Sequence, residues 1–200
     1  MYALVEDGSI TKIINNPKSM IIADVQYPAK IFQLWSQEEL NQIGIYEVIT
    51  DSSNYKDEAY YINTNEEYNF ANEQVTRSWG TATPKRLEDE DAVDKDGNNI
   101  VDEDGNKVIY YGLKTEKKRI VKQQASGLLE KTDWHNHKAL DDDTYTIPDN
   151  IKSYRANVRA KSNEMETQID ACNRVEELET LYTRDQNGVR PLAEFPVLES

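Results

Sequence analysis

A long amphipathic helix in the second half of the chain is the feature that most constrains the fold. Pro148 suits its first turn, because the missing N–H of proline has no helical partner to lose there. Apolar residues then recur at spacings of three, four or seven, which places them along one face of a helix of about six turns. These residues are Ile151, Tyr154, Val158, Met165, Ile169 and Cys172.

A second helical pattern begins near Thr115. The two helices are expected to fold back on each other as an αα-hairpin, across a polar connector at residues 131–147. A short helix at residues 175–181, a turn at residues 185–188 and an extended stretch from Pro191 follow. The expected apolar face of the first helix comprises Ile120, Val121, Gln124, Leu128 and Leu129. The basic residues outside this face are Lys117, Lys118, Arg119 and Lys122.

The first part of the chain has a different, β-rich pattern. Asp7-Gly8 lies between two apolar runs, which is a strong signal for a β-hairpin. Ser36 stands three residues before Glu39, a capping-box spacing that opens a short helix. Gly44 can end that helix, since glycine readily takes the left-handed conformation. Further strands are expected at residues 59–70 and 74–81.

Residues 86–113 form an acidic segment between these two parts. Nine acidic residues fall between Glu88 and Asp104, and Lys95 alone opposes them. An eight-residue unit occurs twice, at residues 93–100 and 101–108, and each copy has an Asp-Gly pair flanked by β-branched residues. Each copy is therefore expected to make one tight turn on an exposed, projecting arm.

The predicted fold class is α+β, with four segments in chain order. A small β-rich domain with one short helix spans residues 1–85, the acidic arm 86–113, the helical hairpin 114–183 and an extended tail 184–200. Hydrophobic residues make up 38% of the chain and charged residues 30%, which leaves a thin core relative to the surface. Such a chain is expected to be elongated, to form small subdomains, or to bury some of its faces only on assembly.

The charge balance disfavours several classes of partner. The chain has 23 Lys and Arg against 37 Asp and Glu, a net charge of −14, which repels nucleic acid and anionic lipid. No apolar run approaches the roughly 18 residues of a membrane span, and residues 1–14 lack the pattern of a signal peptide. Cys172 is the only cysteine, so no internal disulfide can form. We expect a protein made in a reducing compartment, without nucleic-acid or membrane partners.

The repeated Asp-Gly-Asn turns suggest a calcium site, but the spacing does not fit one. If Gly97 is set at position six of an EF-hand loop, position one is Ala92, and with Gly105 it is Ile100. The first ligand is missing in both alignments. A solvated acidic turn is the better explanation, and weak cation binding of another kind stays open.

The remaining chemistry-bearing residues do not assemble into an active site. His135 and His137 alternate as two zinc ligands can, with acidic residues 141–143 nearby, but no third nitrogen or thiolate stands at a suitable spacing. Cys172 falls on the apolar stripe, where a buried, inert thiol is expected. We predict no catalytic residue, no metal site and no cofactor, and hence no enzyme. A hydrolase with an unfamiliar site is the least favoured alternative.

One block of residues spans the predicted hairpin. It has Leu-Leu on the first helix, then Thr-Asp-Trp, a polar connector, and a helix that opens with Tyr-Arg and a further Arg. The residues concerned are Leu128, Leu129, Asp133, Trp134, Tyr154, Arg155 and Arg159. This block resembles the phage tail assembly chaperone family, although the chain departs from the family pattern at His135-Asn-His137 and in a longer connector at residues 141–146.

The resemblance implies a bacteriophage tail protein that acts by protein–protein binding. It would be a structural component of the tail fibre or baseplate, or the chaperone that assembles it; the alternative is an intracellular adaptor unrelated to phage. The expected partners are tail fibre or baseplate proteins, with self-association left open. The expected location is the virion tail, or the host cytoplasm during assembly. The residues that match the family pattern are the expected partner-binding residues, with Trp134 packed between the helices and Asp133 capping a turn.

The C-terminal tail contributes two further candidate partner-binding residues, Phe195 and Leu198. Two prolines, Pro191 and Pro196, bias the tail toward an extended path. The segment is too short to bury its own apolar side chains. It must lie on the chain's own surface, with the N-terminal domain as the candidate, or in a groove of a neighbour, and we expect the neighbour.

Overall fold

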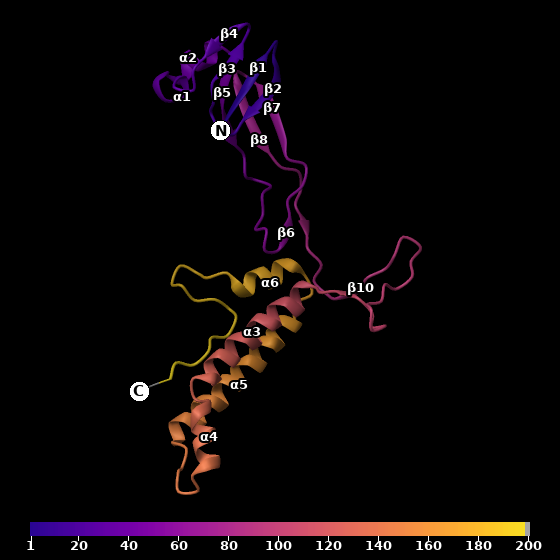
Figure 1. The fold of residues 1–200 in the computed structure, drawn as a ribbon, viewed down its shortest axis with the longest axis vertical. Helices are drawn as coiled ribbons and strands as arrows, with labels where there is room; N and C mark the ends of the chain where they lie inside the picture. The colour runs from indigo at the N-terminus through magenta and orange to yellow at the C-terminus, as the bar shows by residue number, and fades with distance from the viewer. Residues whose placement is uncertain (199–200) are drawn as a thin grey trace. The chain divides into compact units, whose positions relative to one another are not determined.

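The computed structural model describes residues 1–198 and contains both strands and helices (Figure 1). The predicted α+β class is confirmed, with a curled mixed sheet and a C-terminal helical region. The chain divides into two compact units, Met1–Thr83 and Pro84–Ser200. The boundary lies close to the predicted one at residue 85, and the second unit combines the arm, the helical hairpin and the tail.

A five-stranded mixed sheet forms the centre of the first unit, in the order β2-β1-β5-β8-β7. β5 and β8 are parallel, and the other paired neighbours are antiparallel. The predicted hairpin at Asp7-Gly8 is confirmed, since both turn residues have positive φ, 49° and 74°, as a two-residue hairpin turn requires. The strands are β1 (Tyr2–Glu6), β2 (Ser9–Ile14), β5 (Ile45–Thr50), β7 (Glu67–Ala71) and β8 (Gln74–Ser78).

Alternation of side chains along β1 gives the sheet a buried surface on both faces. Leu4 packs on one face with Ile45 and Leu40. Ala3 and Val5 point the other way and pack with Val75. The cluster around Leu4 also draws on α1 (Ile31–Leu34), α2 (Gln37–Gln42) and the strand β3 (Met20–Ile22), which pairs with β4 (Val25–Tyr27).

Local sequence signals around α2 are confirmed. The Ser36 hydroxyl accepts a hydrogen bond from the backbone N–H of Glu39 at 3.2 Å, and the Ser36 N–H donates to the Glu39 carboxylate at 2.7 Å. Gly44 follows the helix with a φ of 82°, and a Cβ there would overlap the carbonyl oxygen of Val5. Glycine is therefore required at this position both by conformation and by space.

The single strand expected at residues 59–70 is wrong. The structure has two strands there, β6 (Tyr61–Ile62) and β7, and Asn65 between them adopts a positive φ of 54°. A left-handed residue breaks the extended path, so the two strands cannot be continuous. β8 ends at Ser78 instead of residue 81, and a two-residue strand, β9 (Thr83–Pro84), follows it.

The acidic arm of the second unit begins and ends in a short ladder between β10 (Glu90–Asp91) and β11 (Ile109–Tyr110). The two tight turns predicted within it are confirmed. Asp94 and Asp102 each accept hydrogen bonds from the backbone N–H groups two and four residues later, at 2.8 to 3.0 Å. The glycine three residues after each Asp has a φ of 85° or 83°. Asp185 makes the same turn nearer the C-terminus.

Four helices follow the arm: α3 (Leu113–Glu130), α4 (Asp133–Asp141), α5 (Asp149–Asp170) and α6 (Val175–Tyr182). α3 and α5 lie side by side as the predicted hairpin (Figure 1). Every residue of the predicted apolar stripe from Ile151 to Cys172 is buried. The expected polar connector at residues 131–147 is corrected, because α4 lies within it.

The buried face of α3 differs from the predicted one. Val121 is buried as expected, but Ile120 and Gln124 are exposed. Lys114 and Ala125 are buried in their place. The prediction favoured large apolar side chains. The buried positions of α3 are instead spaced by seven and four residues, and they include the charged Lys114 and the small Ala125.

The lysines of α3 form ion pairs across the hairpin. Lys118 Nζ lies 2.7 Å from Asp170 Oδ1, and Lys122 Nζ lies 3.2 Å from Glu166 Oε2. A step of four residues forward on α3 thus matches a step of four back on α5, as an antiparallel pair requires. Two of the four basic residues of this run, Lys118 and Lys122, therefore link α3 to α5.

Candidate partner-binding surface

The corner where α3, α4 and α5 meet is built around the side chain of Arg155. Its Nη1 donates to the backbone oxygen of Leu129 at 2.8 Å and to the Thr132 hydroxyl at 2.7 Å. Its Nη2 lies 2.8 Å from Asp133 Oδ1. Arg155 is only 8% exposed. The guanidinium thus satisfies a carbonyl at the C-terminal end of α3, where carbonyls lack helical partners and attract positive charge.

Asp133 and Trp134 do not lie as predicted. Asp133 is the first residue of α4 and pairs with Arg155, and α4 has no side-chain cap hydrogen bond, so the expected capping role is wrong. Trp134 is 54% exposed instead of packed between the helices. Consecutive helical residues point about 100° apart, and in α4 it is the neighbouring His135 that is buried.

Trp134 belongs to an aromatic cluster on α4 and the segment after it. Its ring stacks on His135 with ring centroids 3.7 Å apart. His135 Nδ1 lies 2.5 Å from the Tyr145 hydroxyl oxygen, and Lys138 Nζ lies 4.3 Å from the centroid of the Tyr145 ring. The cluster holds the indole in a defined orientation while leaving half of it accessible to a partner.

The other residues of the matched block divide between a hydrophobic cluster and the solvent. Tyr154 is buried together with Ala125 and Val158, and Leu128, Leu129 and Phe195 pack against them while partly exposed. Arg159 is exposed, and its Nη1 reaches the backbone oxygen of Arg155 at 3.4 Å. The structure therefore brings the matched leucines, Tyr154 and Arg155 together, and places Arg159 beside them on the surface.

The C-terminal tail lies on the chain's own helices, which corrects the expectation that it sits in a neighbour's groove. Leu192 is 2% exposed, and its N–H donates to the backbone oxygen of Leu181 at 3.0 Å. Gln168 of α5 contacts the tail twice: its Nε2 donates to Pro191 O at 3.2 Å, and its Oε1 accepts from Ala193 N at 2.9 Å. The tail thus packs against α5 and α6 of its own unit.

Sequence reasoning missed three residues that build this surface. Gln168 lies outside the apolar stripe of α5, and nothing in the sequence marks it as a contact of the tail. Tyr145 falls in a stretch expected to be irregular. Thr132 stands directly before Asp133 in the sequence and is buried at 2% exposure in the corner, so its position next to a predicted site residue is the signal that could have found it.

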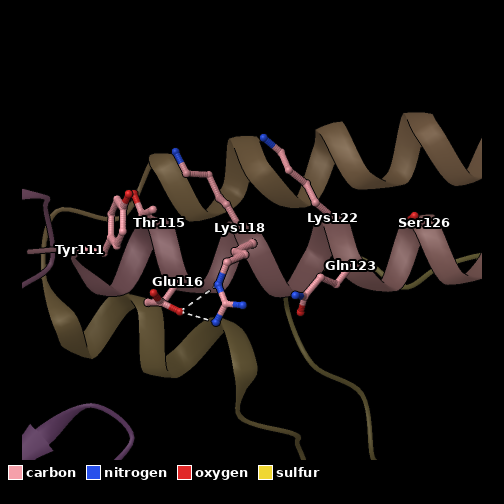
Figure 2. Close-up of a pocket in the computed structure, with 8 residues that line it drawn as sticks. Tyr111, Thr115, Glu116, Lys118, Lys122, Gln123 and Ser126 are labelled. Atoms are coloured by element: carbon pink, nitrogen blue, oxygen red, sulfur yellow. Dashed lines mark hydrogen bonds and ion pairs between the residues drawn. The ribbon is translucent and has the colours of Figure 1, made fainter. Parts of the chain in front are cut away.

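A groove of about 700 Å³ runs along α3 (Figure 2). Arg119 donates from Nη2 to a Glu116 oxygen at 2.8 Å within it, and Lys118 and Lys122 pair with the acids of α5. Its charges are therefore largely neutralised inside the chain. It contains none of the predicted site residues and is lined by Tyr111, Thr115, Glu116, Lys118, Arg119, Lys122, Gln123 and Ser126.

Within residues 1–198, no group of three or more His, Cys, Asp or Glu side chains is arranged to hold a metal ion. His135 is engaged by Tyr145, whereas His137 is exposed. Cys172 is buried as predicted, and burial raises the pKa of its thiol. A raised pKa keeps the thiol protonated at neutral pH, which makes it a poor nucleophile.

No family model, no curated protein and no solved structure matches this chain. In the part of the chain that the structure describes, no helix combines the length and the apolar character that crossing a membrane requires.

Proposed function

We propose that this chain is a non-enzymatic bacteriophage tail protein that acts by protein–protein binding. It serves as a structural component of the tail fibre or baseplate, or as the chaperone that assembles it. The observation that carries the proposal is the network at the Arg155 corner, where Arg155 contacts both Leu129 and Asp133. The proposal therefore rests on the resemblance of these residues together with their position at one corner of the hairpin.

The surface beside this corner suits a protein partner. Trp134 presents a half-exposed indole that is already oriented by its stacking on His135. Tryptophan is enriched among the residues that dominate binding energy at interfaces, and a pre-oriented side chain loses less entropy on binding. We therefore assign the first contact with the partner to Trp134 and the outer side of α4.

The test is capture of the partner from cells that are assembling phage tails, with mass spectrometry to identify it. We expect the tagged chain to retain a tail fibre or baseplate protein and Trp134→Ala to lose most of it. The substitution should lower the free energy of unfolding by about 1–3 kcal/mol, because the half-buried indole loses its stacking on His135 and part of its buried area. Val93→Ala, an exposed apolar position on the acidic arm and away from α4, is the control and should retain the partner.

Mass spectrometry of purified particles then separates the two roles, since a structural component stays in the virion and a chaperone does not. Neighbouring genes that encode no fibre or baseplate protein, together with capture of unrelated cellular proteins, would favour the intracellular adaptor.

A further inference from the structure

The contacts of the C-terminal tail show which groups the surface of the helices beneath it can bind. Gln168 contacts the main chain on both sides of Leu192, through Pro191 O and Ala193 N, much as a neighbouring strand would. Leu192 is fully enclosed, and Phe195 packs against Ala125, Tyr154 and Val158. The surface thus recognises an extended main chain with an apolar side chain followed, three residues later, by an aromatic one.

The hold on the tail is light. Outside these contacts the described tail residues are mainly exposed, with Val197 at 85% and Leu198 at 38%. Main-chain hydrogen bonds to the helices are made at Pro191, Leu192 and Ala193, and each contributes only about 0.5–1.5 kcal/mol net. The preceding residues 183–189 are exposed. Segments with few buried contacts and an exposed connection open locally without global unfolding.

The charged residue of the tail is held by the tail's own segment. Glu194 pairs with Arg184 at 3.0 Å and with Arg190 at 2.8 Å, and both arginines belong to the same connecting stretch. Arg190 also lies over the Tyr182 ring of α6, with its Cζ 5.8 Å from the ring centroid. Because the two arginines that pair with Glu194 belong to the connecting stretch, a replacing segment needs no acidic residue to reproduce an ion pair with the helices.

We infer that residues 191–198 occupy a peptide-binding groove formed by α3, α5 and α6, and that an extended segment of a partner protein displaces them. This inference rests on the proposed function only in requiring a protein partner. A further cavity of about 460 Å³ lies beside Pro196, Val197 and Leu198 and is lined also by Asn150, Ser153, Tyr154 and Asn157. A partner segment with larger side chains at these positions buries surface that the chain's own tail leaves open.

A second copy of this chain is disfavoured as the occupant. Two copies each carry a net charge of −14 and repel one another. Each copy's own tail is also tethered beside its groove, where it competes at the high effective concentration of an intramolecular ligand. A partner segment must overcome the same competition, and the open cavity beside the tail provides the additional contacts.

The test uses a fluorescently labelled peptide of residues 190–198 and the full-length chain. Leu192→Ala combined with Phe195→Ala removes the two apolar anchors of the tail and leaves the groove intact. We expect fluorescence polarisation to show that the peptide binds this double variant at least about tenfold more tightly than wild type. Val197→Ala, a tail substitution at an exposed position, should bind as wild type does, and a peptide with alanine in place of Phe195 should not bind the double variant.

Hydrogen exchange on the wild-type chain tests the same inference without any substitution. The amide protons of Leu192 and Ala193 should exchange at least about 100-fold faster than those of the buried half of α5, because the tail opens locally. Equal protection would mean that the tail leaves only on global unfolding, which overturns the inference.

Two other results would also overturn it. Equal peptide binding to the wild type and the double variant places the site elsewhere, and binding to neither shows that no groove is available. A tail-dependent dimer in light scattering would make a second copy the occupant. The peptide assay needs no phage component. A negative result in it therefore contradicts the groove and not the proposed function, and a negative capture experiment contradicts the proposed function and not the groove.

Discussion

At the scale of single residues, Arg155 is the side chain on which the helical corner depends. Its guanidinium is buried and donates to Leu129 O and Thr132 Oγ1 while pairing with Asp133. Arg155→Met keeps the aliphatic bulk and removes the donors. We expect the free energy of unfolding to fall by about 1.5–3 kcal/mol, the range for hydrogen bonds to charged groups.

Urea denaturation at neutral pH measures this change, with Arg159→Met as the matched control one helical turn away. Arg159 is exposed, so its replacement should change the free energy of unfolding by no more than about 0.5 kcal/mol. If both substitutions had the same effect, the network around Arg155 would not be a determinant of stability.

Three aspartates that form the same turn, Asp94, Asp102 and Asp185, set a pH dependence. The pKa of each is lowered, chiefly because a backbone N–H four residues later donates to its carboxylate. A pKa lowered in the folded state means that the turn is stabilised at pH values above the unfolded pKa of about 3.9, and that this contribution is lost as the pH falls through the folded pKa.

Carboxyl NMR titration should therefore give midpoints below about 3.9 for all three residues. The amide proton of Asn98 should shift with the midpoint of Asp94, because it donates to that carboxylate at 2.9 Å. Asp94→Asn should abolish this shift and leave the shift of Asn106, which donates to Asp102, unchanged. Midpoints at or above the ordinary value would show that the turns do not hold the charged form.

At the scale of elements, the start of α3 is fixed by the base of the arm. Asp89 accepts from the backbone N–H of Gly112 at 2.8 Å and from the Thr115 hydroxyl at 3.0 Å. A Cβ at Gly112 would overlap the backbone of Leu87 and Glu88. The close approach of two backbones is therefore possible only with glycine.

Two glycines of the same region give opposite predictions. Gly112→Ala forces the arm base away from α3 and should lower the free energy of unfolding by about 1–3 kcal/mol, as overpacking does. Gly127→Ala, at an exposed position within α3 with no atom within 4 Å of the new Cβ, should raise it by about 0.5–1 kcal/mol. Thermal denaturation followed by circular dichroism compares them, and a destabilising Gly127→Ala would contradict this account of the helix.

At the scale of the whole molecule, the two compact units are expected to fold independently. The first has its own buried clusters around Leu4 and Val75, and the second has the stripe of α5 and the cluster around Val158. Fragments 1–83 and 84–200 should each give a dispersed amide NMR spectrum that overlays on that of the full chain away from the boundary. An unfolded spectrum from either fragment would show that its core needs the other unit.

The sequence alone determined the features whose causes lie within a few residues. The turn at Asp7-Gly8 and the capping box at Ser36 follow from local hydrogen bonds and backbone conformation, and the stripe from Ile151 to Cys172 follows from helical periodicity. Leu129, Asp133 and Arg155 of the Arg155 corner were among the predicted site residues, whereas Thr132 was not.

Only the tertiary structure decided which side chains are covered. Trp134 is half exposed because α4 turns His135 inward, and Phe195 is partly buried because the tail crosses the helices beside Gln168. Whether a side chain is buried depends on which element, distant in the sequence, packs against it. A tryptophan or phenylalanine is equally apolar whether its own chain or a partner covers it, so the residue type does not distinguish the two cases. That is the physical reason why sequence patterns predicted the elements and not the surface they present.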